Sequence, residues 1–457
     1  MSQTSRREFL RQAAAFSLLQ AAGPLGLQLA GIGAASAAEA PADDYRVLVC
    51  LFLYGANDGH NTVLPLAPDA YATYAAARAS IALPHEQILP LPGQDLGLHP
   101  ALAPLHPLFQ RGQMAVLANV GPLLVPIPDA TAFKAGVIPR PPKLFSHNDQ
   151  QAIWQAFSPE GATLGWGGRI ADLLASHNGS PLFTAVSASG SAVLLAGKQT
   201  LPYQITPEGA IGFQRITTGK PRTAAVTQAL RAQISAGSGL IARDYAAVVE
   251  RSIEAESLLS GALAGLPAED ARVALPEDLA RNNLAKQLQI VARLIGVRGE
   301  SGLAQRRQVF FVSLGGFDTH DDQLVRQQKL LTDVASAVAW FQEALGRLEA
   351  SRQVTLFTAS DFGRTLTANG DGSDHGWGSH HFIVGGAVQG GKVYGEFPEV
   401  ALSTRLDVGN GRLLPTTAVD QYAATLARWM GVREADLPLV LPNVRQFGSH
   451  DLGFMRT

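Results

Sequence analysis

The chain has 457 residues, of which 46% are hydrophobic and 16% are charged, with 36 basic side chains against 38 acidic ones. The ample hydrophobic content excludes extensive disorder, and the nearly even charge balance argues against a broad nucleic-acid-binding surface. A single cysteine excludes an intrachain disulfide framework and any cysteine-rich zinc or iron–sulfur site. Cys50 lies in an apolar run, so we expect it to be a small buried hydrophobic residue.

The N-terminus has the pattern of an export signal. The adjacent pair Arg6 and Arg7 precedes an apolar run, residues 13–35, which contains no charged residue and leads into the small-residue sequence Ala-Ser-Ala at residues 35–37. This arrangement is typical of a twin-arginine signal peptide, and the Gly and Pro content of the run disfavours the alternative of a membrane anchor. We therefore predict that residues 1–38 are cleaved off near Ala37, and that the export machinery is a partner. The mature protein is expected to be periplasmic or secreted, without a stable membrane span.

The mature chain alternates between predicted strands and predicted helices. Residues 45–54 form a nearly continuous apolar run that fits a strand buried on both faces of a parallel sheet. The alternation predicts an α/β fold of three layers, a mainly parallel sheet with helices on both faces. Further strands are predicted at residues 114–120, 309–314, 354–358 and 381–385, and helices at residues 99–110, 323–348 and 418–429.

The middle of the chain is different in character. Long Ala/Leu/Arg/Glu-rich stretches at residues 246–263 and 277–297 predict helices without intervening strands. We therefore predict a single α/β domain over residues 39–457, with a helical insertion at about 223–300. Whether the insertion is a lid or a dimer face stays open, as does the oligomeric state.

Two clusters of polar residues precede the middle of the chain. The first, at residues 55–62, follows the first predicted strand and offers Asp58 as a metal ligand and Asn61 as a supporting group, although both could simply satisfy turn geometry. The second, at residues 144–151, contains Ser146, either as a nucleophile or as the N-cap of the following helix. No Gly-x-Ser-x-Gly elbow occurs in the chain, so a metal is the more natural activator of a serine nucleophile.

Two further clusters follow later strands, where ligands bind in open α/β sheets. Residues 315–323 offer Asp318 and His320, which could share one metal. Residues 358–381 are the densest cluster, and Arg364 in it could clamp an anionic oxygen of phosphate or sulfate. Its candidate metal ligands are Asp361, Asp374, His375, His380 and His381.

Imidazole and carboxylate groups together suit one divalent metal ion or a close pair. Zinc is the preferred ion, with manganese, iron and calcium as alternatives. The residue types do not decide which of His380 and His381 faces the metal. The ligand set we favour is Asp58, Asp318, His320, Asp361, His375 and His381.

Several motifs in this order resemble a bacterial family. They include FLYGANDGHNT, FSHNDQQAIWQ, GGFDTHDDQ, TASDFGRT, DHGWGSHHFIVGGAVQGG and GRLLPTTAVDQYAATLARWMGV. On these motifs the chain is identified as a member of the twin-arginine-exported domain-of-unknown-function family 1501, over nearly the whole mature sequence. That family is similar to the alkaline phosphatase and sulfatase superfamily, which implies an alkaline-phosphatase-like fold.

The resemblance also implies roles for individual residues. Asp58 would match the first metal-binding Asp of the superfamily, and Ser146 would match its nucleophile. The later ligands would be matched by Asp318 with His320, by Asp361, and by His375 or His381.

The chain departs from the superfamily pattern at two places. The middle ligand pair is spaced Asp-x-His, where phosphatase-like members commonly have Asp-x-x-x-His. Phe362 stands where an Asp-His dipeptide would place the His. Either change could cost a second metal or shift its ligation to His375 or His380.

These features favour an exported, metal-dependent hydrolase of phosphate or sulfate esters, acting on a small anionic ester. Ser146 or a water molecule would be the nucleophile, while Arg364 and Asn61 would hold the non-bridging oxygens. One alternative is a non-catalytic metal-binding, ligand-binding or assembly protein on the same fold. Another, an oxidoreductase, lacks support because no Gly-x-Gly-x-x-Gly follows a strand.

Overall fold

The computed structural model describes residues 44–210, 240–300 and 302–456. The predicted signal peptide, residues 1–38, lies outside the described residues, as does the predicted start of the insertion at about residue 223. Within the described residues, no helix is both long enough and apolar enough to cross a membrane.

The described strands have short to medium lengths. They are β1 (Arg46–Leu53), β2 (Val63–Pro65), β3 (Leu89–Pro90), β4 (Leu96–Leu98), β5 (Met114–Gly121), β6 (Ala185–Ser187), β7 (Tyr203–Thr206), β8 (Gly209–Ala210), β9 (Arg307–Leu314), β10 (Val354–Ser360), β11 (Arg364–Ala368), β12 (Ser373–His375), β13 (Ser379–Gly385), β14 (Val393–Tyr394) and β15 (Thr417–Ala418).

The described α-helices lie between these strands. They are α3 (Pro68–Arg78), α4 (His106–Gln110), α5 (Ala130–Ala135), α6 (His147–Ala156), α7 (Trp166–Leu174), α10 (Leu240–Ala264), α11 (Asn283–Gly296), α12 (Gln323–Arg347), α13 (Val419–Met430) and α14 (Leu437–Val440).

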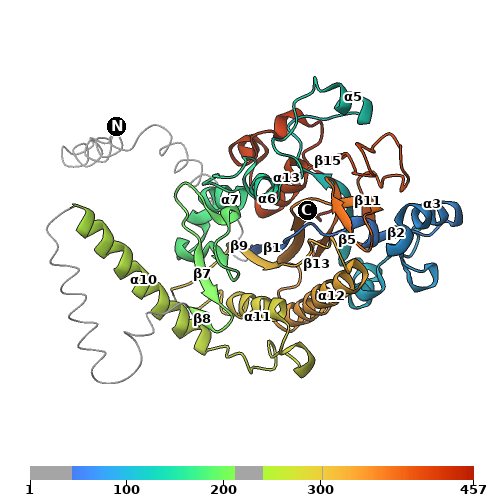
Figure 1. The fold of residues 1–457 in the computed structure, drawn as a ribbon. Helices are drawn as coiled ribbons and strands as arrows, with labels where there is room; N and C mark the ends of the chain where they lie inside the picture. Colours follow the sequence, from blue (N-terminus) through green and yellow to red (C-terminus); the bar gives the residue numbers. More distant parts are fainter. Residues whose placement is uncertain (1–43, 211–239, 301, 457) are drawn as a thin grey trace, which may run out of the picture.

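One large sheet forms the centre of the molecule (Figure 1). In the described part of the chain it has ten strands, in the order β14-β5-β13-β10-β1-β9-β6-β7-β8, with β15 beside β5. Strand β1 is parallel to both of its neighbours, β9 and β10, and β6 continues the parallel run beyond β9. Strand β13 is antiparallel to β10 and β5, and β8 is antiparallel to β7. The sheet is therefore mixed but mainly parallel, as predicted.

Helices cover both faces of the sheet. Alternate residues of β1 belong to two different cores: Val49 packs in the core that contains residues of α11 and α12, whereas Cys50 packs in the core that contains residues of α7 and α13. Figure 1 shows α11 and α12 on one side of the strands, with α6, α7 and α13 on the other. The predicted three-layer α/β fold is confirmed, and Cys50 is a buried free cysteine.

Most predicted elements have their structural counterparts within a few residues. The apolar run at 45–54 is β1, and the amphipathic stretch at 323–348 is α12. The predicted helix at 99–110 differs, because it consists of a 3₁₀-helix (Pro100–Leu105) followed by the short α4. Pro104 and Pro107 lack the N–H groups that a continuous α-helix would need there. Helix α10 covers the first stretch predicted in the insertion, and α11 covers the second only from Asn283 onward, after a 3₁₀-helix at Glu277–Leu279. The insertion's boundaries stay a prediction.

Candidate metal centre

The candidate site lies where the three central parallel strands end. Strands β1, β9 and β10 run side by side in register, so the segments that follow Leu53, Leu314 and Ser360 meet at the carboxyl edge of the sheet. Gly55 and Asp361 lie in two of these segments, and the Gly55 N–H donates to the Asp361 carboxylate at 3.3 Å. Gly55 has φ +105°, and a Cβ there would lie 2.4 Å from the backbone nitrogen of Asp318, so only glycine fits.

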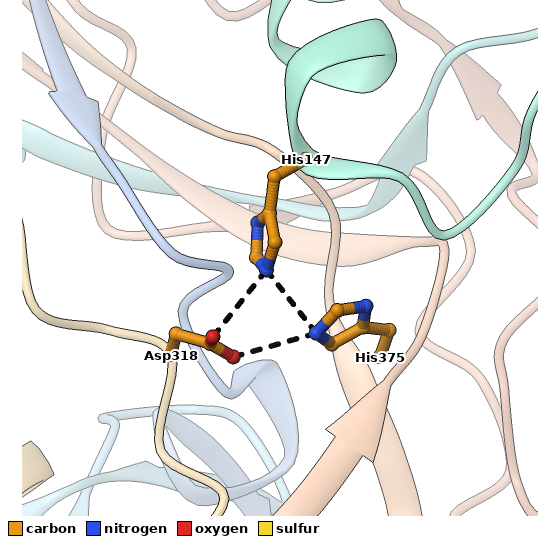
Figure 2. Close-up of side chains that lie close together, drawn as sticks. All are labelled: His147, Asp318 and His375. Carbon is orange, nitrogen blue, oxygen red and sulfur yellow. Dashed lines mark hydrogen bonds and ion pairs between the residues drawn. The ribbon is translucent and has the colours of Figure 1, made fainter.

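Three side chains from distant parts of the chain converge at this edge (Figure 2). They are His147 at the start of α6, Asp318 after β9, and His375 at the end of β12. Their ligand atoms all lie within 4.8 Å of one another. The two imidazole Nε2 atoms are 3.1 Å apart; Oδ2 of Asp318 lies 3.5 Å from Nε2 of His147, and Oδ1 lies 3.4 Å from Nε2 of His375.

The ring of His147 is oriented by a buried carboxylate. Its Nδ1 lies 2.6 Å from Oδ2 of Asp361, so Nδ1–H donates to that oxygen and Nε2 faces the other two residues. Asp361 has no exposed surface and also accepts a hydrogen bond from Gln151 at 2.7 Å. This hydrogen bond to Asp361 is the main reason why the pKa of His147 is raised. Asp361, predicted as a ligand, thus lies behind His147 as its hydrogen-bond partner, an arrangement common at metal-binding histidines.

The ring of His375 is oriented by the backbone. Its Nδ1 lies 2.8 Å from the carbonyl oxygen of Phe145, which fixes the tautomer that leaves a lone pair on Nε2. Strand β12 pairs with β11 so that His375 is opposite Arg364, and this hairpin holds the imidazole over the sheet edge. Burial lowers the pKa of His375, which favours the neutral ring.

This hydrogen bonding suits a cation. With both Nδ1 atoms donating, the Nε2 lone pairs of His147 and His375 face each other at 3.1 Å, which is repulsive unless a proton or a cation lies between them. In tetrahedral zinc sites with bonds of about 2.0–2.1 Å, neighbouring ligand atoms are about 3.3–3.4 Å apart. The two Nε2 atoms, 3.1 Å apart, are close to that spacing, and with one ligand atom taken from each of the three residues all three atoms lie within 4.8 Å of one another. Two imidazoles and a carboxylate are also donors that zinc accepts.

Asp318 is kept ionised by Arg364. Burial alone would raise the pKa of Asp318, but the hydrogen bond and charge of Arg364 outweigh it and lower the pKa. The Arg364 Nη1 donates to Asp318 Oδ1 at 3.0 Å, while its other nitrogens donate to Ser373. Arg364 was predicted to clamp a substrate oxygen, but its guanidinium is buried and paired. Its contacts make it a positioning residue for Asp318.

His320 lies at the outer side of the three residues. Its Nε2 is 3.0 Å from both Asp318 Oδ1 and His375 Nε2, and its Nδ1 is 3.5 Å from Asp374. The side chain is 43% exposed, so it stands at the mouth of the site. The structure therefore brings together three of the predicted ligands, Asp318, His320 and His375.

Phe362 forms an apolar wall of the site. Its ring centroid is 4.8 Å from that of His147 and 4.8 Å from that of His375. Phe362 is buried and offers no donor where the superfamily pattern expects a histidine.

Asp58 and Asn61 lie apart from the group of three. The Asp58 carboxylate forms a fully buried ion pair with Arg78 and accepts from Gln323 at 2.6 Å. Asn61 has no exposed surface; its amide donates to the carbonyl of Ile81, and its oxygen accepts from Arg78. Neither side chain has a free group with which to hold a metal ion or a substrate, so the structure corrects both predictions.

The histidine doublet is part of the core. Strand β13 lies between β5 and β10 in the sheet, whose faces are covered by helices, and both rings are buried. His380 stacks on Phe397 with ring centroids 4.8 Å apart, and His381 packs on Trp154 at 4.8 Å. Burial lowers the pKa of each histidine to about 3, so both are neutral. The prediction of His381 as a metal ligand is corrected: its neighbours are aromatic rings and the hydroxyl of Thr358.

Ser146 occupies the N-cap position of α6 without capping the helix through its side chain. Its hydroxyl donates instead to Oδ2 of Asp149 at 2.8 Å. Asp149 is buried and also lies 3.3 Å from Lys143. The serine proton is thus directed away from the imidazole of the adjacent His147, which faces Asp361 and His375.

His147 is the site residue that the sequence prediction missed as a ligand. It was treated only as the neighbour of a candidate nucleophile, Ser146. The signal that could have found it is its place in a polar cluster at the start of a predicted helix, since Asp318 also lies in a polar cluster that precedes a helix.

One family model matches part of the chain. Residues 217–434 match the family model described as "Protein of unknown function (DUF1501)". This match confirms the family resemblance, although it covers a shorter part of the chain than the motifs do. No curated protein gives a significant match.

Solved structures give distant similarities. The PsFucS1 sulfatase from Pseudoalteromonas sp. is 11% identical, with a TM-score of 0.37, over 95% of this chain and 78% of that one. Ps i-CgsB in complex with k-i-k-neocarrahexaose is 8% identical, with a TM-score of 0.36, over 89% and 78%. A 2-O GAG sulfatase is 10% identical, with a TM-score of 0.30, over 86% and 71%.

Proposed function

We propose that this chain, whose residues 217–434 match the model of the DUF1501 family of proteins of unknown function, is a metal-dependent hydrolase of phosphate or sulfate esters. The observation that carries the proposal is the convergence of His147, Asp318 and His375, with both imidazole Nε2 atoms facing the same point. Three protein ligands are typical of catalytic zinc sites, whereas structural zinc sites use four.

The residues around the group support the same conclusion. Asp361 and the Phe145 carbonyl hold the two rings in the tautomers that a cation needs, and Arg364 keeps Asp318 ionised. When bound, a divalent cation supplies Lewis-acid chemistry, since it polarises an ester oxygen and acidifies water. Zinc fits the donor set best, and manganese and iron are alternatives that use the same donors.

Water is a better candidate than Ser146 for the attacking group. The Ser146 hydroxyl is engaged with Asp149, and no described contact joins it to His147, Asp318 or His375. His320 is half exposed at the mouth and presents Nε2 toward Asp318 and His375, where it can hold a water molecule by a hydrogen bond. The buried ring of Phe362 packs against the imidazole of His147.

The test is metal content and hydrolysis measured on the same protein. Full-length mature protein should carry one equivalent of zinc by mass spectrometry and hydrolyse p-nitrophenyl phosphate or p-nitrophenyl sulfate. His375→Ala should lose both properties, because it removes one of three ligands. His106→Ala is the matched control, since the described hydrogen bond of that imidazole is to the carbonyl oxygen of Pro90 and involves no residue of the candidate site. Absence of stoichiometric metal after reconstitution would overturn the proposal.

A second candidate function is supported by the position of His320. Its Nε2 lies 3.0 Å from two of the three ligand atoms, so His320 could complete a closed set of four protein ligands. A closed set is typical of structural zinc sites. The chain would then be a non-catalytic metal-binding protein, which retains metal but hydrolyses neither ester.

Export is a separate part of the proposal. We propose that residues 1–38 direct the protein through the twin-arginine route to the periplasm or the medium, on the sequence pattern alone. Replacing Arg6 and Arg7 together by lysine should leave the uncleaved precursor inside the cell. Normal cleavage and export of that double variant would contradict this route.

A further inference from the structure

A second arginine, besides Arg364, lies beside the candidate metal centre. Arg412 lies in the GRLLP segment of the family-like motif, in a turn between Asp407 and Leu413. Its Nε donates to the carbonyl oxygen of His375 at 2.7 Å, so it touches the backbone of a candidate ligand. Its guanidinium carbon also lies 5.1 Å from the ring centroid of Phe145, the residue whose carbonyl orients the His375 imidazole.

The turn that carries Arg412 is held by its own hydrogen bonds. Oδ1 of Asp407 accepts from the N–H groups of Gly409 and Gly411 at 2.7 and 2.8 Å. Asn410 between them has a left-handed backbone with φ 56°. The backbone of Arg412 is thereby fixed next to β12, so that little side-chain ordering is needed when a ligand binds.

The charge of Arg412 is not matched by a carboxylate. Within the described residues, Arg412 forms no ion pair, and its Nη1 donates only to the Gly409 carbonyl at 3.3 Å. The described hydrogen bonds leave its Nη2 unused, and the side chain is half-buried. Arg364 differs, because it is fully buried and paired with Asp318. Arg412 therefore differs from Arg364 in having N–H groups, those of Nη2, that no described hydrogen bond uses.

We propose that Arg412 binds the anionic group of the substrate, and so selects phosphate or sulfate esters over uncharged esters. This inference rests on the proposed function for the location of the reacting group, but it concerns anion binding by the chain itself. Arginine forms charge-assisted, often bidentate hydrogen bonds with phosphate and sulfate oxygens, and a half-buried position strengthens them. On these contacts, Arg412 takes the place of Arg364 and Asn61, which the sequence analysis predicted to hold the non-bridging oxygens of the ester.

The test is calorimetric titration of zinc-loaded protein with inorganic phosphate and with inorganic sulfate. In Arg412→Gln, the Kd of the anion that the unmodified protein binds should rise about tenfold or more. Zinc content and thermal unfolding should stay unchanged in this variant. The Kd of Arg412→Lys should lie between those of the unmodified protein and Arg412→Gln, because lysine keeps the positive charge but lacks the planar guanidinium group. Arg111→Gln, which removes an exposed arginine that contacts only Gln113, is the matched control and should bind normally.

The outcomes separate the two proposals. An unchanged Kd in Arg412→Gln overturns the inference, as does a failure of the unmodified zinc-loaded protein to bind either anion. Loss of zinc in Arg412→Gln also overturns it, because Arg412 would then act only by positioning His375. Arg412-dependent anion binding without hydrolysis of either nitrophenyl ester supports the inference and contradicts the proposed function.

Discussion

The Nδ1 atom of His147 lies 2.6 Å from Oδ2 of Asp361, although the two residues are 214 positions apart in the chain. The contact joins the first turn of α6 to the carboxyl end of β10. Asp361 is unexposed and accepts two further donors, the Gly55 N–H and the Gln151 amide, so its position is well defined. A carboxylate held in this way fixes both the ring orientation and the tautomer of His147.

Asp361→Asn should therefore weaken zinc binding without removing a ligand. Loss of this kind of carboxylate partner typically lowers metal affinity about 10–100-fold. Zinc affinity can be measured by competition with a chromogenic chelator. Asp321→Asn is the control, because Asp321 is exposed and contacts only Arg326. An affinity in Asp361→Asn equal to that of the control would show that Asp361 does not orient His147.

His320→Ala distinguishes an open site from a closed one. If His147, Asp318 and His375 suffice, the variant keeps one equivalent of zinc, while hydrolysis of the nitrophenyl esters falls at least tenfold because the group at the mouth is gone. Zinc content and rate should be measured on the same preparation. Loss of zinc together with an unchanged thermal unfolding midpoint of the metal-free form would favour the closed, non-catalytic site.

The strand ends were predictable from the sequence, because buried parallel strands are recognisable as apolar runs. Asp318 and Asp361 each follow such a run, and the rule that ligands bind at carboxyl ends of strands puts both at one edge. The register of β1 with β9 and β10 then brings these ends side by side.

The individual partners were not predictable, since they depend on contacts between distant segments. His147 is more than two hundred residues from both Asp361 and His375, and nothing local indicates that α6 begins beside β12. For His381, the sequence predicted a metal ligand where the structure has a core residue. Its position in a histidine-rich run suggested a ligand, but a strand with neighbours on both sides and helices on both faces buries its side chains.

His381→Ala should destabilise the fold and leave the metal site intact. The ring is 1% exposed and packs on Trp154 and Tyr422, so truncation leaves a cavity that costs about 2–4 kcal/mol of unfolding free energy. Urea denaturation measures that loss, and mass spectrometry should still find one equivalent of zinc. His375→Ala is the counterpart, which should lose zinc. Zinc loss in a folded His381→Ala protein would restore His381 as a candidate ligand.

Asp420 should make the stability of the fold fall as pH rises. It lies in the first turn of α13; burial raises its pKa to about 7, and its Oδ2 has no hydrogen-bond partner in the described residues. Since the folded-state pKa exceeds that of the unfolded chain, about 3.9, the unfolded chain releases this proton first. The contribution of Asp420 to the free energy of unfolding is therefore fully present below about pH 4. It falls by about 1.4 kcal/mol per pH unit as the pH rises to 7.

Asp420→Asn should remove this slope, because the amide does not titrate and its oxygen can still accept from the Asn443 N–H, which lies 3.2 Å from Oδ1 of Asp420. Urea denaturation at pH 5, 6, 7 and 8 gives the free energy of unfolding of each protein. Between pH 5 and 7, the free energy of unfolding of the variant should increase relative to that of the unmodified protein by roughly 1–3 kcal/mol. Glu86→Gln, at an exposed carboxyl, should show no such change. Parallel pH profiles for Asp420→Asn and the unmodified protein would mean that Asp420 keeps an ordinary pKa in the folded protein.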